Sequence, residues 1–138
     1  DPAKAGDTRW IHRPKMKWEF LQELDDTIGP EGGSIRRRIF RSLQKLITVR
    51  KNMHALAGQQ MELVNTGNPH LLSFIRIVDS HRLIVLANFD DSPQSFDGNR
   101  LRTVGLGRFF KDALTDKEYG TSAPIELEAY QFLWLQRI

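Results

Sequence analysis

The sequence predicts a mainly β protein: an antiparallel β-sandwich preceded by one long amphipathic α-helix and an irregular N-terminal segment. Apolar residues recur every three or four positions after Ser34, which is a helical period. After Gly58 the pattern changes to short runs rich in Val, Ile, Leu and Phe, which is typical of strands. Turn signals separate these runs by about 8–12 residues, a spacing that favours a sandwich. The length of 138 residues suits one domain.

Residues 1–33 are polar and contain several glycine and proline breakers. We expect this segment to be poorly ordered where nothing holds it, because short polar termini fray. Within it, residues 17–28 place Trp18, Leu21 and Leu24 at a helical spacing. This spacing predicts one short helix in an otherwise irregular segment.

The clearest element is a helix over residues 35–52. Ser34 follows two glycines and is a favourable N-cap, and Arg50 and Lys51 suit the negative end of the helix dipole. The helix is expected to end near Asn52. Its apolar stripe consists of Ile35, Ile39, Phe40, Leu43, Leu46, Ile47 and Val49.

The rest of the chain predicts strands. They are expected over residues 60–65, 70–78, 82–89, 95–98, 100–105 and 125–138, with a turn at 116–120. The second and third runs are separated by a three-residue turn signal and predict a β-hairpin. The last run alternates and is rich in β-forming residues, so it predicts one long final strand.

Composition and charge exclude several classes of protein. A net charge of +3 arises from 20 basic and 17 acidic residues, which indicates a mixed surface rather than a polycation. The arginines of the helix therefore favour a solvated face, and we expect no nucleic-acid partner. No apolar run approaches the roughly 18 residues of a membrane span, and no signal peptide is visible. The absence of cysteine excludes disulfides and leaves the redox compartment undetermined. Because the chain begins with Asp1, we expect a processed chain or a piece of a larger protein.

No self-contained catalytic or metal site is expected. The four histidines, His12, His54, His70 and His81, lack the spacing of a ligand set, so we predict no metal and no cofactor. The acid pairs Asp25–Asp26 and Asp90–Asp91 stand next to turn residues, where such acids serve solvation and capping. Adjacent acids do not face each other across a sugar, as a glycosidase pair must. Neither a glycine-rich phosphate loop nor a G-x-S-x-G turn is present.

Several segments together resemble the end of the catalytic barrel and domain C of the α-amylase superfamily of glycoside hydrolases. The matching positions are Leu43, Leu46, Ile47, Arg50, Ala55, Leu56 and Gly58 at the helix end, Phe74, Arg76, Asn88 and Phe89 in the hairpin, and Leu127, Tyr130, Trp134 and Leu135 in the last run. The resemblance implies that residues 1–57 are the end of the barrel, comprising a loop and its last helix. It implies that residues 58–138 form the C-terminal β-sandwich domain, with Greek-key connections.

The stretch DTRWIHRP (residues 7–14) resembles the motif after the eighth barrel strand of amylosucrase and related sucrose hydrolases. The resemblance implies that Arg9 helps to close the sugar pocket of the parent enzyme, in an ion pair with a barrel aspartate, and that His12 is a second pocket residue. No position matches the family's nucleophile, acid/base or stabilising aspartate. The chain is therefore expected to be a non-catalytic fragment that stabilises a missing (β/α)8 barrel acting on sucrose or an α-glucan.

Two alternatives stay open at this point. An independent carbohydrate-binding module would use an exposed aromatic platform, for which Trp134 is the candidate, although it shares a strand face with Phe132 and favours a core position. A nucleic-acid-binding fragment would use the arginine-rich helix. In the isolated chain, the apolar stripe of that helix is expected to be exposed, and so to cause a homodimer or a domain-swapped form.

Overall fold

A computed structural model describes residues 6, 17–19, 34–103 and 105–138. The chain divides into two compact units, residues 1–44 and 45–138. Nearly all of the expected helix at 17–28 lies outside the described residues. So do Arg9, His12 and most of residues 1–33, the segment expected to be poorly ordered. Those expectations stay predictions.

The long helix is confirmed as α1 (Ile35–Asn52). Ser34 caps it as predicted: its Oγ accepts a hydrogen bond from the N–H of Arg37 at 3.3 Å. A short 3-10 helix, η4 (His54–Leu56), follows directly. The exposed apolar stripe is also observed, because Ile35, Ile39, Phe40, Leu43 and Ile47 are 43–73% exposed.

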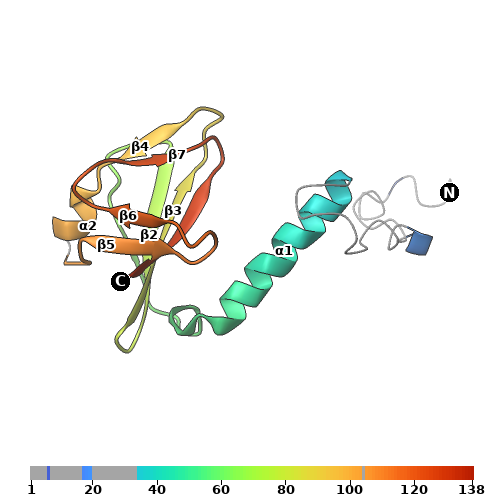
Figure 1. Cartoon of the computed structure of the whole chain (residues 1–138), viewed down its shortest axis with the longest axis horizontal. Coiled ribbons are helices and arrows are strands. Elements are labelled where there is room, and N and C mark those ends of the chain that lie inside the picture. Colours follow the sequence, from blue (N-terminus) through green and yellow to red (C-terminus); the bar gives the residue numbers. More distant parts are fainter. Residues whose placement is uncertain (1–5, 7–16, 20–33, 104) are drawn as a thin grey trace. The chain divides into compact units, whose positions relative to one another are not determined.

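Two antiparallel sheets make up most of the rest of the described chain (Figure 1). The larger sheet consists, in spatial order, of β1 (Met61–Leu63), β2 (Leu71–Val78), β3 (His81–Asn88), β8 (Phe132–Arg137), β5 (Phe109–Asp112) and β6 (Glu118–Gly120). The smaller sheet pairs β4 (Gln94–Phe96) with β7 (Ile125–Leu127). The predicted hairpin is β2–β3, with Val78 opposite His81.

The connections alternate between the sheets. The chain leaves the larger sheet after β3 to form β4, returns as β5 and β6, leaves again as β7 and returns as β8. Strand β8 inserts between β3 and β5, so that sequentially distant strands become neighbours, as in a Greek key. The predicted class, a mainly β antiparallel sandwich preceded by a helix, is confirmed.

The core lies between the two sheets. The larger sheet contributes Leu71, Ile75, Ile84, Leu86, Phe110, Leu133 and Leu135, and the smaller sheet contributes Phe96, Ile125 and Leu127. Most of these side chains are fully buried. The smaller sheet is therefore held mainly by apolar packing, since it has only one ladder of its own.

The strand predicted at residues 100–105 is wrong. Residues 99–103 form a short helix, α2 (Asn99–Thr103), which buries Leu101 in the core. Asp97 starts it, because its Oδ1 accepts a hydrogen bond from the N–H of Asn99 at 3.0 Å. The cap at Asp97 and the burial of Leu101 favour a helix here over the strand that the alternating pattern predicted.

The single strand predicted at 125–138 is also wrong, because it is two strands in different sheets, β7 and β8. Between them the N–H of Gln131 donates to the carbonyl of Glu128, and Tyr130 adopts a left-handed conformation with φ of 55°. The turn predicted at 116–120 is displaced, since its second half forms β6. The β5–β6 connection instead lies at residues 113–117.

Candidate functional site

The two faces of the larger sheet differ in what covers them. Along β2, Leu71, Ser73 and Ile75 point into the core between the sheets. Because successive strand residues point to opposite faces, Leu72 and Phe74 lie on the other, outer face. The smaller sheet does not cover this outer face. What the face can bind therefore depends on which other parts of the chain cover it.

Strand register extends this outer face across four strands. Leu63 is opposite Phe74, which is opposite Val85, which is opposite Trp134. In the next row, Leu72 is opposite Ala87, which is opposite Phe132. The two rows make a continuous apolar surface.

One part of the outer face is covered by the chain itself. Met53, Ala55 and Leu83 form a second buried cluster, against which Val49, Leu56, Val85 and Trp134 also pack. The C-terminal end of α1 and η4 therefore cover the Trp134 side of the face. Trp134 packs against this cluster as predicted and is partly buried, which disfavours it as the exposed platform of a carbohydrate-binding module.

The remainder of the outer face is open. We call Leu63, Leu72, Phe74, Ala87 and Phe132 the open sheet face. Leu63 is 72% exposed, and Leu72 and Phe132 are each 40% exposed. These five side chains are all apolar, so the surface suits contact with another apolar surface.

A polar network closes one end of the sandwich. Asn88 is buried, and its Nδ2 donates to the carbonyls of Ser92 and Glu128, each at 2.9 Å. Its Oδ1 accepts from the N–H of Asp90 at 2.9 Å. Asn88 thus ties the end of β3 to the β7–β8 turn, with its side-chain hydrogen-bonding groups in use.

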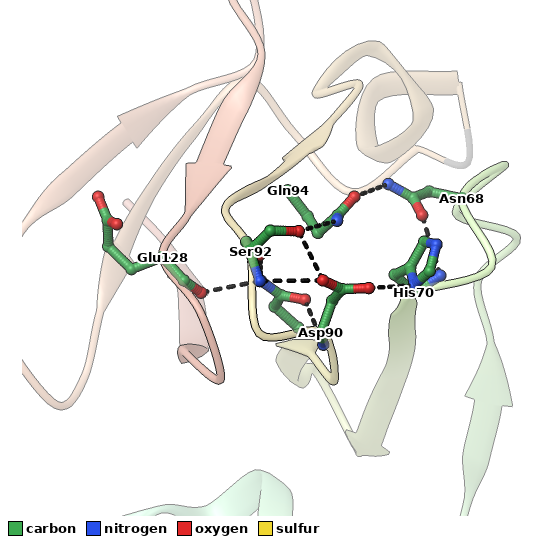
Figure 2. A network of polar contacts seen from close by, with 7 residues as sticks. Asn68, His70, Asp90, Ser92, Gln94 and Glu128 are labelled. Carbon is green, nitrogen blue, oxygen red and sulfur yellow. Dashed lines mark hydrogen bonds and ion pairs between the residues drawn. The ribbon is translucent and has the colours of Figure 1, made fainter.

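Figure 2 shows the Asp90 carboxylate between His70 and Ser92. Its Oδ2 lies 2.5 Å from Nδ1 of His70, and its Oδ1 accepts from the hydroxyl of Ser92 at 2.5 Å. The serine donates to the carboxylate and not to the imidazole, so this trio lacks the serine–histidine–aspartate order of a nucleophilic triad. It acts as a clamp between the 66–70 and 88–94 loops, to which Asn68 and Gln94 add a hydrogen bond of 2.9 Å.

The clamp lowers the pKa of Asp90, mainly through the hydrogen bonds from Ser92 and also through the charge of His70. A depressed carboxyl pKa stabilises the fold above the unfolded-state value of about 4, and that stabilisation is lost as the pH falls through the folded-state pKa. Asp90→Asn is therefore expected to be less stable than the wild type at pH 7. The difference should shrink below pH of about 4, as measured by urea unfolding at several pH values.

Asp97→Asn is the matched control, because it removes a carboxylate of the same type but keeps the Oδ1 acceptor for Asn99. A stability difference between wild type and Asp90→Asn that stays constant down to pH 3 would contradict the role of the Asp90 charge.

The remaining candidates do not assemble a chemical site. The rings of His54 and His81 lie 4.9 Å apart, and His54 Nε2 lies 3.4 Å from Asp79 Oδ2, at an exposed position. Across residues 34–103 and 105–138, no three His, Asp or Glu side chains gather closely enough to hold a metal ion. No helix in the described part of the chain is long and apolar enough to span a membrane. Sequence reasoning missed the open sheet face, although its alternating apolar residues were visible.

Residues 61–134 match the family model for the C-terminal domain of maltogenic amylase. The fold is similar to that of AmyP, solved with maltotriose, at a TM-score of 0.62 and 16% identity over 76% of this chain and 22% of that one. It is also similar to the trehalulose synthase MutB from Pseudomonas mesoacidophila MX-45, at a TM-score of 0.51 and 19% identity over 70% of this chain and 18% of that one. The chain thus corresponds to about a fifth of the length of these proteins.

Proposed function

Because the chain belongs to the family of maltogenic amylase C-terminal domains, we propose that its sandwich packs against the (β/α)8 barrel of a larger α-amylase-family enzyme and stabilises that barrel. The open sheet face is the observation that carries this proposal. Apolar surface of this kind lowers the free energy when it is removed from water, by about 25 cal/mol per Å². We propose no catalytic role for the domain itself.

The position of the helix end supports the same surface. Val49 and η4 already pack on the outer face of the larger sheet, so the chain reaches the sandwich from that side. We propose residues 1–57 as the last loop and helix of the barrel and residues 58–138 as the C-terminal domain.

The substrate of the parent enzyme is proposed to be sucrose, with an α-glucan as acceptor or product. The front motif with Arg9 and His12 supports this, through its resemblance to sucrose-acting enzymes. One matched fold, MutB, was solved with the substrate sucrose, whereas AmyP was solved with maltotriose. At 16–19% identity these folds leave the choice to experiment.

Phe132→Asp in the full-length enzyme tests the docking surface. An aspartate there would be buried without a partner in the interface, which is expected to lower the stability of the barrel by about 2–3 kcal/mol. In the isolated 138-residue chain, kept dilute enough to be monomeric, the same change should cost about 1 kcal/mol, because Phe132 is 40% exposed. Calorimetry of both proteins measures the two effects.

Ala123→Asp is the control, because it adds the same charge at an exposed loop position outside the open sheet face. Equal effects of the two substitutions in the full-length enzyme would contradict docking through this face.

In the isolated chain we expect the same face and the α1 stripe to pair with a second copy. Light scattering should then show Phe132→Asp shifting the chain toward the monomer.

Arg9→Ala in the full-length enzyme tests the proposed sugar pocket. Removing the arginine leaves its proposed aspartate partner with an uncompensated charge, so turnover of sucrose should fall by about tenfold or more. Lys15→Ala, a charge removal outside the motif, serves as the control in the same kinetic assay. Normal turnover by Arg9→Ala would remove Arg9 from the pocket and leave the docking proposal intact.

A further inference from the structure

A second concave surface lies on the opposite, core-facing side of the larger sheet, at the end that the smaller sheet does not cover. Its floor consists of Ile84, Leu106 and Phe110, which are only 1–5% exposed. Its volume is about 730 Å³, which falls within the range of small-molecule sites. All three residues belong to the core cluster, so the packing of the sandwich itself forms the floor.

The rim of this groove carries positive or potentially positive side chains. His81, Arg82 and Arg137 line it, and its lining includes no Asp or Glu. A neighbouring hollow of about 460 Å³ shares Arg137 and adds Arg102 and Arg108. The groove therefore combines an apolar floor with a cluster of guanidinium groups.

None of these four arginines forms an ion pair with a carboxylate in the part of the chain that the structure describes. The ion pairs there include those of His54, His70 and Lys111, and none involves these four arginines. Like charges that gather without a counter-charge repel one another, and a bound anion relieves that repulsion.

The loop at Gly107, beside the groove, lets the side chain of Arg137 lie close to its backbone. Gly107 has φ of 122°, a conformation that favours glycine, and an added Cβ would lie 3.2 Å from Cδ and Nε of Arg137. The missing side chain thus lets the arginine lie directly over the loop. This leaves its guanidinium at the boundary between the two hollows.

We propose that this groove binds an organic anion. The apolar body of the ligand lies over Ile84, Leu106 and Phe110, and its carboxylate or phosphate group meets Arg82 and Arg137. Arginine suits this role because its planar fork matches both groups with two parallel hydrogen bonds. The proposal is independent of barrel docking, since the floor faces the core side of the sheet and the open sheet face lies on the other.

The test is a titration of the 138-residue chain, followed by amide chemical shifts. Phenyl phosphate and benzoate carry both features, whereas inorganic phosphate carries only the charge and benzyl alcohol only the ring. We expect saturable shifts at the amides of Ile84, Leu106 and Phe110 with phenyl phosphate or benzoate. Their affinity should exceed that of the single-feature probes at least tenfold and fall as salt is added. The tighter of the two identifies the preferred anionic group.

Arg137→Ala and Arg82→Ala should each weaken binding of the better probe at least fivefold, and Arg137→Lys should weaken it less than Arg137→Ala. Arg50→Ala, in α1 and lining a different hollow, should leave the affinity unchanged. Urea unfolding of each variant checks that it is folded. Benzyl alcohol binding as well as phenyl phosphate, shifts that avoid the groove, or indifference to Arg137→Ala in a folded protein would overturn the proposal.

Discussion

Replacing Asp112 by alanine is expected to destabilise the sandwich by about 3–5 kcal/mol. Asp112 ends β5 and is fully buried. Its Oδ1 accepts from the N–H of Trp134 at 2.9 Å and from the N–H of Leu114 at 3.3 Å. Its Oδ2 accepts from the hydroxyl of Thr115 at 2.6 Å.

The large effect follows from what the substitution leaves behind. Alanine would strip a buried backbone N–H of the central strand β8 of its acceptor, and each unsatisfied buried group costs about 1–3 kcal/mol. The β5–β6 connection would also lose two of the bonds that shape it. Because β8 lies between β3 and β5, the damage reaches the middle of the larger sheet.

Asp112→Asn is the matched variant, because its amide oxygen can still accept from Trp134 and Leu114. It should cost about 1 kcal/mol, with the Thr115 hydroxyl turned to accept instead of donate. Urea unfolding of the 138-residue chain measures both variants. Equal losses for alanine and asparagine would show that the two Oδ1 bonds are not what makes Asp112 matter.

The elements that the sequence predicted correctly are those whose pattern is local. Helix α1 has its cap, stripe and basic end within one stretch, and the β2–β3 hairpin has two alternating runs around a short turn. The prediction of one strand over residues 125–138 was wrong because the alternating pattern continues through a turn, and that turn depends on the positive φ of Tyr130. The strand predicted over residues 100–105 was wrong because Leu101 is buried against strands that lie far away in the sequence.

The candidate site shows the same division. Alternation placed Phe132 and Trp134 on one strand face, but their environments differ, since η4 and Val49 cover Trp134. That contact joins residues about 80 positions apart, and no local pattern encodes it. For the same reason the sequence could not show that Asp90 and His70 form one clamp, or that arginines from α2, β3 and β8 gather near one groove.

Phe96→Ala is expected to cost about 3–5 kcal/mol, the range for removing a fully buried phenylalanine. Phe96 is 0% exposed and lies in β4, opposite Ile125 of β7. These two strands are the whole smaller sheet, so they have no further ladder to hold them in place. Loss of the ring would leave a cavity between the sheets. It would also weaken the attachment of the smaller sheet, which covers the core.

Phe109→Ala provides the comparison within the same residue type, because Phe109 is 62% exposed in β5. It should change the free energy of unfolding by about 0.5 kcal/mol or less. Amide exchange adds a spatial test of the same idea. In Phe96→Ala, protection should fall first in β4 and β7, while the β2–β3 hairpin, which has its own ladder and the cover of η4, stays protected longer.

The effect on the proposed barrel contact depends on which of the two sheets is destabilised. The open sheet face belongs to β1, β2, β3 and β8, so it persists only as long as the larger sheet keeps its twist and register. Phe96→Ala removes the packing that holds the inner side of that sheet. If the sandwich docks on a barrel as proposed, the full-length enzyme should lose barrel stability together with the domain. Calorimetry of the full-length protein should show the two transitions falling in parallel for Phe96→Ala. A barrel transition that stays at its wild-type temperature while the domain transition falls would mean that the barrel does not rely on this sandwich.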